Sequence, residues 1–262
     1  MPFRIVQSKQ NSRLKELRGA LAHPGQGARG VAGRDSRSLA GIEGPNLLEG
    51  LPLPAETEVL LVPRELLESA LATETPQPVA ALVEPPRWDW ADVLGEQTKG
   101  SPLIVVLAGL QDPGNLGTTL RSAEAFGAQA VVSLPGTVSA WNPKAVRASA
   151  GSVFRLPLLS VSAEDCFARL REAGVKIWTT AVHGAEPANR IDLAGPVALV
   201  IGNEGNGVPE ALAALADGAV TIPCPGPVES LNAAVAVSVL LYEASRQRAG
   251  RIQPRKAKGR VQ

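Results

Sequence analysis

The chain has 262 residues, 45% of them hydrophobic and only 3% aromatic, so it is long enough for two domains with largely aliphatic cores. Its two cysteines, Cys166 and Cys224, lie far apart and show no metal-ligand spacing, which predicts reduced thiols in a cytoplasmic protein without a metal. The amino-terminal residues are polar and basic and no apolar run reaches transmembrane length, so we expect neither a secretory signal nor a membrane partner.

The net charge of +1 conceals an uneven distribution along the chain. Residues 1–42 carry a net +6 and residues 246–262 a net +7, which leaves −12 for the residues between them. Basic ends on an acidic body fit contact with a phosphate backbone, and they equally fit solvated termini. With so few aromatic side chains, contacts to nucleic acid would depend on charge and backbone groups more than on base stacking.

Residues 1–84 contain short apolar runs among glycines and prolines. The runs Leu47–Leu48, Val59–Val62 and Val79–Val83 predict pieces of a small α/β domain, whereas the Gly-rich segment 19–44 predicts little regular structure. Prolines, glycines and charges dominate residues 85–102, which we interpret as a linker between two domains.

From residue 103 onward, short apolar runs alternate regularly with helical patterns. Strands are expected at Leu103–Ala108, Ala130–Leu134, Val153–Leu159, Val175–Ala181, Val197–Ile201 and Ala219–Ile222, and helices near 115–127, 143–150, 163–173, 208–216 and 233–248. Near-continuous apolar strands separated by helices indicate an α/β fold with a mostly parallel sheet and helices on both faces. Ligands of such open sheets usually bind where loops leave the carboxyl ends of strands.

The first Gly-rich loop follows the strand at 103–108 and has the sequence GLQDPGNLG. Where such a loop opens a helix, its backbone N–H groups are available to an anion, and Asn115 is a candidate cap for that helix. Arg121 lies about a turn and a half further on, where its guanidinium can bind an RNA phosphate through paired hydrogen bonds. Arg121 is equally compatible with an ordinary exposed position on an amphipathic helix.

The second loop, with the sequence GNEGNG over residues 202–207, directly follows the strand at 197–201. Three glycines in six residues indicate a tight backbone turn and close approach of a ligand, which a plain connection would not require. Glu204 is the only charged residue of this loop.

The third segment runs from the strand end at Ile222 through a Pro- and Gly-rich turn to Ser230, Leu231 and Asn232. The helix expected after it is apolar almost all round, which predicts burial in a core or in a subunit interface. Ser230 and Asn232 are good helix caps. Taken alone, this segment therefore fits a capping role as well as a place in a ligand site.

Together the three loops resemble the SpoU (TrmH-type) branch of the SPOUT RNA methyltransferases. Asn115–Arg121 match the pattern N-x-G-x-x-x-R, Leu199–Gly207 contain G-x-E-x-x-G, and Ile222–Asn232 match I-P-x-x-G-x-x-x-S-L-N, in the order of that family. The segment KAVRASAG, residues 144–151, resembles a further stretch of the family in which Arg147 faces RNA.

The amino-terminal part resembles the small substrate-binding domain of the family more loosely, through Gln10-Asn11, Lys15 and Ile42–Gly44. Cys224 stands where methionine is common and Ala233 where valine is usual. Both departures change packing and leave the polar residues intact.

The resemblance implies methylation of a ribose 2′-hydroxyl in RNA with S-adenosylmethionine as cofactor, with ribosomal RNA of the 23S type expected before transfer RNA. It also implies a homodimer and a trefoil knot in the carboxy-terminal region. The implied domains are an RNA-binding domain at 1–84, a linker at 85–102, a catalytic domain at 103–248 and a basic tail at 249–262. The implied catalytic residues are Arg121, Asn115, Glu204, Ser230 and Asn232; Gly202, Ile222 and Leu231 would bind the cofactor, and Arg147, Arg13 and Lys15 the RNA.

Two other classes of function compete with this interpretation. A non-catalytic RNA-binding or ribosome-assembly protein could share the scaffold. Binding alone, however, would not require the full polar set of Arg121, Glu204, Ser230 and Asn232. A nucleotide-dependent oxidoreductase is a second alternative, but the chain lacks G-x-G-x-x-G after its first strand.

Overall fold

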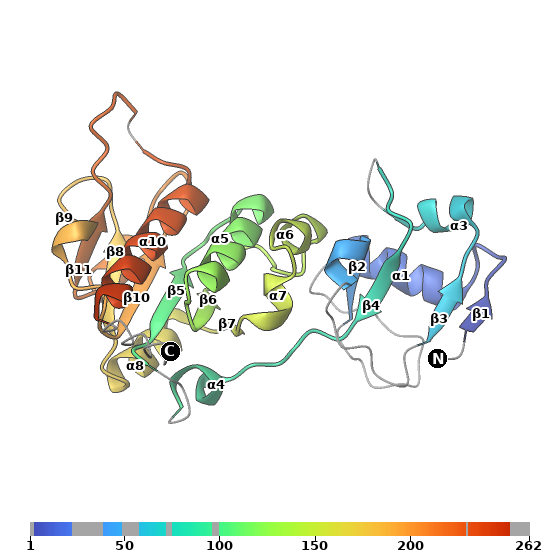
Figure 1. Cartoon of the computed structure of the whole chain (residues 1–262), viewed down its shortest axis with the longest axis horizontal. Coiled ribbons are helices and arrows are strands. Elements are labelled where there is room, and N and C mark those ends of the chain that lie inside the picture. Colours follow the sequence, from blue (N-terminus) through green and yellow to red (C-terminus); the bar gives the residue numbers. More distant parts are fainter. Residues whose placement is uncertain are drawn as a thin grey trace, which may run out of the picture. The chain divides into compact units, whose positions relative to one another are not determined.

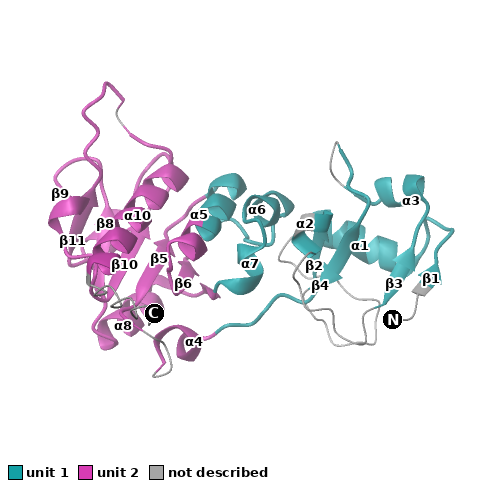
Figure 2. Cartoon of the chain, viewed as in Figure 1, with its two compact units in different colours: residues 1–88, 111–121, 138–156 teal, residues 89–110, 122–137, 157–262 magenta. Residues whose placement is uncertain are grey.

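The computed structural model describes residues 3–22, 39–48, 58–71, 75–95, 100–228 and 230–251. The chain forms two compact units, of residues 1–88, 111–121 and 138–156 and of residues 89–110, 122–137 and 157–262 (Figure 2). Most of the Gly-rich segment 19–44 and of the basic tail 249–262 lies outside the described residues.

The first unit begins with short strands and helices around a small core. Strand β1 (Phe3–Ile5) pairs in parallel with β3 (Val59–Leu61), and β2 (Ala40–Glu43) pairs antiparallel with β4 (Ala80–Val83). Helix α1 (Ser12–Ala22) buries Leu14, Leu17 and Leu21, and α2 (Pro45–Leu48) and α3 (Arg64–Glu68) complete this part. Strands β3 and β4 fall within the predicted runs 59–62 and 79–83.

The first unit also contains the beginning of α5 (Pro113–Ala125), together with α6 (Pro143–Ala148) and α7 (Ser152–Arg155). Asn142 caps α6, because its Oδ1 accepts a hydrogen bond from the Lys144 amide at 2.9 Å. Trp141 and Phe154 pack together with ring centroids 5.5 Å apart.

The second unit is built on a seven-stranded sheet with the order β7-β6-β5-β10-β8-β11-β9, in which every pairing is parallel (Figure 1). Its strands are β5 (Leu103–Leu107), β6 (Ala130–Ser133), β7 (Leu158–Ser160), β8 (Lys176–Thr180), β9 (Glu186–Pro187), β10 (Val197–Ile201) and β11 (Gly218–Thr221). All residues of the central strands β5 and β10 are buried, as expected for strands covered on both faces. The predicted parallel α/β sheet is confirmed.

The remaining elements of this unit are helical: α4 (Trp90–Leu94), α8 (Ala163–Glu172), the 3₁₀ turn η1 (Ala188–Arg190), α9 (Glu210–Ala213) and α10 (Ala233–Arg251). Helix α4 lies within the range predicted as a linker. Its Val93 is fully buried and the indole of Trp90 donates to Asp165 Oδ2 at 2.8 Å. None of the helices in the described ranges is long and apolar enough to cross a membrane.

Two predicted elements were wrong in extent. The run Val153–Leu159 is not one strand: its first part is helix α7, and only Leu158–Ser160 joins the sheet. Helix α7 starts directly after Gly151, whose φ is +86°, and Pro157, which has no amide proton, separates α7 from the strand. An apolar run alone does not distinguish helix from strand. The helix expected at 208–216 is limited to Glu210–Ala213 and starts after Pro209.

The strand order creates a switch point between β5 and β10. From β5 the chain continues to β6 on one side, whereas from β10 it continues to β11 on the other side. Loops that leave two such strands in opposite directions open a crevice at their carboxyl ends, which is where open α/β sheets bind ligands. The first two Gly-rich loops follow β5 and β10.

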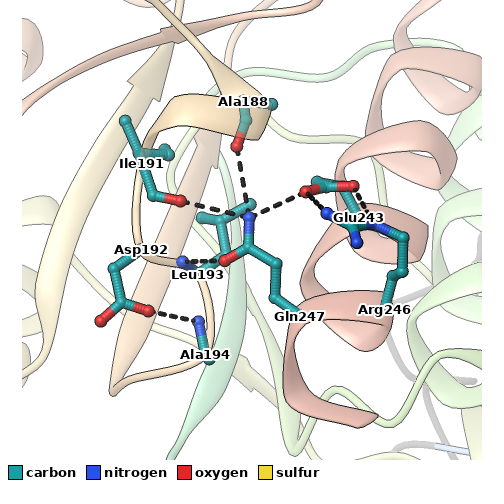
Figure 3. Close-up of polar contacts among 8 residues, drawn as sticks. All are labelled: Ala188, Ile191, Asp192, Leu193, Ala194, Glu243, Arg246 and Gln247. Atoms are coloured by element: carbon teal, nitrogen blue, oxygen red, sulfur yellow. Dashed lines mark hydrogen bonds and ion pairs between the residues drawn. The ribbon is translucent and has the colours of Figure 1, made fainter. Parts of the chain in front are cut away.

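Helix α10 is fastened near its end by Gln247 and Arg248. The Gln247 amide donates to Ile191 O at 3.2 Å and to Glu243 Oε1 at 2.8 Å, while its Oε1 accepts from the Leu193 amide at 2.8 Å (Figure 3). The Arg248 guanidinium donates to the carbonyls of Ser101, Pro102, Leu193 and Gly195. These carbonyls lie just before β5 and β10, at the amino-terminal ends of the two strands, whereas the Gly-rich loops leave the carboxyl ends.

Candidate active site

The loop after β10 is a compact turn held by its own backbone. The amides of Asn203 and Gly207 each donate to the other residue's carbonyl at 2.9 Å, and Asn203 Oδ1 accepts from the Gly205 amide at 2.9 Å. Gly202 has no room for a side chain, because a Cβ there would lie 2.0 Å from the Gly207 carbonyl carbon. Gly207 has a φ of +67°, which favours glycine. Glu204 lies exposed at the tip of this turn.

Asn203 connects this turn to the loop after β5. Its Nδ2 donates to Gly109 O at 3.0 Å, and the Gly109 amide in turn donates to Thr137 Oγ1 at 3.1 Å. The Thr137 hydroxyl donates to Leu107 O at 2.9 Å, so the ends of β5, β6 and β10 are tied together at the switch point. The sequence alone did not identify Asn203 or Thr137 as residues of the site. Asn203 could have been found, because it is a short polar residue inside the second motif.

The loop after β11 carries the third motif into helix α10. Asn232 caps this helix, as its Oδ1 accepts from the amides of Ala234 at 3.0 Å and Val235 at 3.3 Å. The capping role considered for Asn232 is thus confirmed. Ser230 is exposed, and Ile222 and Leu231 are half-buried and present apolar surface in the same loop.

In the first unit, Asp112 organises the start of α5. Its Oδ1 accepts from the Asn115 amide at 2.9 Å and its Oδ2 accepts from Lys144 Nζ at 3.0 Å. The backbone hydrogen bond from Asn115, followed by Lys144, lowers the pKa of the Asp112 carboxyl below its ordinary value. The prediction that Asn115 caps the helix is wrong, because the helix starts at Pro113 and Asp112 supplies the capping carboxylate.

Gly117, the glycine of the first motif, has a packing role. A Cβ at this position would lie 2.3 Å from Ala145 O and 2.6 Å from the Cβ of Ala148, both on α6. The missing side chain therefore lets α5 and α6 approach closely. Together with the Asp112–Lys144 ion pair, this contact fixes the helix that carries Arg121 against the helix that carries Arg147.

The candidate cationic residues of the first unit differ in their partners. Arg121, Arg147 and Lys15 are exposed, and no hydrogen bond or ion pair joins their side chains to another residue of the described ranges. Arg13, in contrast, pairs with Glu16 at 2.7 Å and Glu58 at 3.5 Å. The hydrogen bond to Glu16 is the main cause that raises the pKa of Arg13. The guanidinium of Arg13 therefore already forms ion pairs with two carboxylates of the protein.

The predicted site residues divide between the two units. Gly202, Glu204, Ile222, Ser230, Leu231 and Asn232 belong to the second unit, where they lie on loops that leave the carboxyl ends of parallel strands. Asn115, Arg121, Arg147, Arg13 and Lys15 belong to the first unit. Within the described residues, no group of three or more His, Cys, Asp or Glu side chains could hold a metal ion.

Comparison with known proteins identifies the family. The SpoU rRNA Methylase family matches residues 102–242, which include all three motifs. The chain belongs to this family. The resemblance inferred from the motifs is thereby confirmed.

Several relatives named as 23S rRNA methyltransferases are similar over most of this chain. It is 34% identical to 23S rRNA (guanosine(2553)-2′-O)-methyltransferase RlmP of Bacillus subtilis over 73% of this chain and 75% of the relative. It is 40% identical to 23S rRNA (guanosine-2′-O-)-methyltransferase RlmB of Xanthomonas campestris over 60% of this chain. That alignment covers 64% of the Xanthomonas protein, slightly less than two thirds.

Solved methyltransferase structures share the fold of nearly the whole chain. An AdoMet-bound rRNA methyltransferase from Sinorhizobium meliloti superimposes with a TM-score of 0.80 at 29% identity, covering 93% of this chain and 98% of that one. The SpoU methyltransferase AviRb from Streptomyces viridochromogenes, in complex with the cofactor AdoMet, gives a TM-score of 0.76 at 28% identity, covering 92% and 100%.

Proposed function

We propose that this chain methylates a ribose 2′-hydroxyl of RNA with S-adenosylmethionine as methyl donor. The observation that carries the proposal is the family match over residues 102–242, within which two of the three motif loops leave the switch-point strands β5 and β10. When bound, S-adenosylmethionine supplies a methyl group activated by a sulfonium. Only RNA offers the 2′-hydroxyl acceptor, which separates this substrate from DNA.

The residues at the switch point fit this cofactor. Gly202 lets the turn after β10 close on its own backbone, and Asn203 and Thr137 hold the carbonyls and amides around it in place. On the loop after β11, Ile222 and Leu231 offer apolar surface. Rigid backbone groups for the polar part of a ligand, together with apolar walls for its base, are typical of small-molecule sites. Gly202, Ile222 and Leu231 would therefore hold S-adenosylmethionine.

Arg121 is suited to the RNA phosphate and to the developing alkoxide. Its guanidinium does not lose its proton in proteins, so we assign it charge stabilisation and orientation, and not proton abstraction. An exposed arginine without a protein partner in the described ranges retains its donors for a substrate. Asn115, Glu204, Ser230 and Asn232 would order the reacting groups through hydrogen bonds.

We infer that the RNA is ribosomal and of the 23S type, because several relatives carry that substrate in their names. Residues 1–84 would bind the RNA apart from the catalytic domain at 103–248, with 85–102 between them. Of the cations predicted to contact RNA, Lys15 and Arg147 are the stronger candidates. The carboxylate pairs of Arg13 leave it fewer donors for a phosphate.

A second copy of the chain would pack on α10. In the single chain this helix is not buried all round: Val235, Val239 and Tyr242 are 49%, 40% and 57% exposed, although Val237, Leu240 and Leu241 are buried. An apolar stripe at helical spacing fits a homodimer interface. Light scattering at micromolar concentration should give twice the mass of the chain, whereas a monomeric mass would contradict this role of α10. The family resemblance also leads us to infer the trefoil knot around this helix.

Methyl transfer can be tested with unmodified 23S rRNA transcribed in vitro and S-adenosylmethionine labelled on its methyl group. We expect the label in RNA at a ribose 2′-oxygen, so that the adjacent 3′-phosphodiester resists alkaline hydrolysis. Arg121→Ala should lower kcat by at least about 100-fold and leave the Kd for S-adenosylmethionine nearly unchanged. Wild-type turnover by this variant would contradict the role of Arg121. RNA binding without cofactor binding would favour the non-catalytic alternative.

A further inference from the structure

Helices α5 and α10 meet through two hydroxyl groups in the second unit. Ser122 Oγ and Ser238 Oγ are 2.7 Å apart, and Ser238 Oγ also lies 2.7 Å from Ala234 O. A serine hydroxyl has one proton, and a carbonyl can only accept. Ser238 therefore donates to Ala234 O, and Ser122 donates to Ser238.

A second contact follows one helical turn further along both helices. The rings of Phe126 and Tyr242 meet edge to face, with centroids 5.9 Å apart and an interplanar angle of 72°. Both contacts join residues separated by the same 116 positions in the sequence. The two helices thus run in the same direction with one fixed register between them.

The hydroxyl pair is poorly explained by stability alone. Replacing both partners of a hydrogen bond with apolar groups is often nearly neutral, and two alanines would fit this half-buried contact. The hydrogen bond between two serine hydroxyls, however, forms at only one position of one helix along the other. A shift by one residue moves a helix about 1.5 Å along its axis, which breaks this bond. The hydrogen bond therefore fixes the rotation of α5 about its own axis and the position of α5 along α10.

These two helices carry the residues of two motifs. Arg121 immediately precedes Ser122 on α5, so a rotation of this helix about its axis also moves the guanidinium of Arg121. Helix α10 starts at the cap Asn232 of the third motif. Resting on the methyltransferase function proposed above, we propose that Ser122 and Ser238 are positioning residues, whose hydrogen bond sets the helix register that methyl transfer requires.

The test compares Ser122→Ala, Ser238→Ala and the double variant in the labelled-methyl assay with 23S rRNA. We expect kcat to fall roughly tenfold in each, since a misplacement near 1 Å costs up to about 100-fold. The double variant should lose no more than either single variant, because all three remove the same hydrogen bond. The Kd for S-adenosylmethionine and the KM for RNA should stay within about twofold, with a change in thermal midpoint below about 3 °C.

Thr119→Val is the matched control on α5. The Thr119 side chain is fully buried, and its hydroxyl has no hydrogen-bond partner among the described residues, so the isosteric change removes a hydroxyl without breaking a hydrogen bond. This variant should keep wild-type kcat, and Ser122→Thr, which retains the hydroxyl, should keep most of it. Three results would overturn the proposal. The first is wild-type kcat in the double variant, and the second is a fall in kcat no larger than the fall in the fraction of folded protein. The third is an equal fall in kcat in Thr119→Val. An inactive wild-type protein would instead refute the proposed function.

Discussion

Gly202→Ala is the substitution for which the structure gives the clearest magnitude. The added Cβ would lie 2.0 Å from the Gly207 carbonyl carbon and 2.2 Å from both Gly207 O and the Val208 nitrogen, whereas ordinary contact begins at 3.4 Å. The backbone of the turn must therefore move by 1.2–1.4 Å, the difference between these distances. Because the obstructing atoms are backbone, no side-chain rotation can relieve the clash.

Such a displacement should affect both stability and cofactor binding. Overpacking of this kind costs roughly 1–3 kcal/mol, which corresponds to a fall in thermal midpoint of about 3–10 °C. The hydrogen bond from Asn203 Nδ2 to Gly109 O would be broken or lengthened, so the two loops at the switch point would separate. We expect the Kd for S-adenosylmethionine to rise at least about tenfold, equivalent to ~1.4 kcal/mol.

Isothermal titration calorimetry with S-adenosylmethionine and thermal unfolding followed by circular dichroism would measure the two effects. Gly205→Ala is the matched control in the same turn, because its Cβ would meet only Asn203 Oδ1 at 3.5 Å, an ordinary contact. This control should bind the cofactor within about twofold of the wild type. If Gly202→Ala binds as tightly as Gly205→Ala, the assignment of this turn to the cofactor is refuted.

Two further predictions concern packing and pH. Gly117→Ala should lower the free energy of unfolding by roughly 1–3 kcal/mol, because its Cβ would meet Ala145 O at 2.3 Å, and urea unfolding that shows equal or greater stability would contradict this packing role. Burial raises the pKa of the Cys166 thiol to about 12. Below pH 9 the thiol is protonated in both states, but between about pH 9 and pH 12 it ionises only in the unfolded chain, so stability should fall with a slope approaching 1.4 kcal/mol per pH unit. Cys166→Ala should reduce this slope in urea titrations at several pH values, and at pH 8 a thiol reagent should modify exposed Cys224 in the native protein and Cys166 only after unfolding.

The sequence predicted the central sheet well because its strands are buried on both faces. The apolar runs at 103–108 and 197–201 contain β5 and β10, and their short length between prolines and glycines favours a buried strand over a helix. Shorter or interrupted apolar runs predicted the type of element less accurately. The run 153–159, for example, is divided between α7 and β7. There, Pro157 lies between the end of α7 and the start of β7, and the apolar residues on its two sides were read as one strand.

The candidate site was predicted as a set of loops and not as a set of contacts. Short motifs identify which residue types recur at which spacing, but they carry no information on partners distant in the sequence. The bond from Asn203 to Gly109 spans 94 positions and that between Ser122 and Ser238 spans 116. The prediction that Asn115 caps α5 failed for a local reason: Asp112, three residues earlier, caps helices equally well and was not considered.

The fastening of α10 by Arg248 has a consequence for how the chain folds. Arg248 binds carbonyls that lie 147, 146, 55 and 53 positions earlier in the sequence. Helix α10 can therefore form these bonds only after the segments that lead into β5 and β10 have come together. Contacts of such high sequence separation close large loops and slow folding. Until then the buried face of α10, with Val237, Leu240 and Leu241, stays in water, so a partly folded chain is prone to aggregate through this helix.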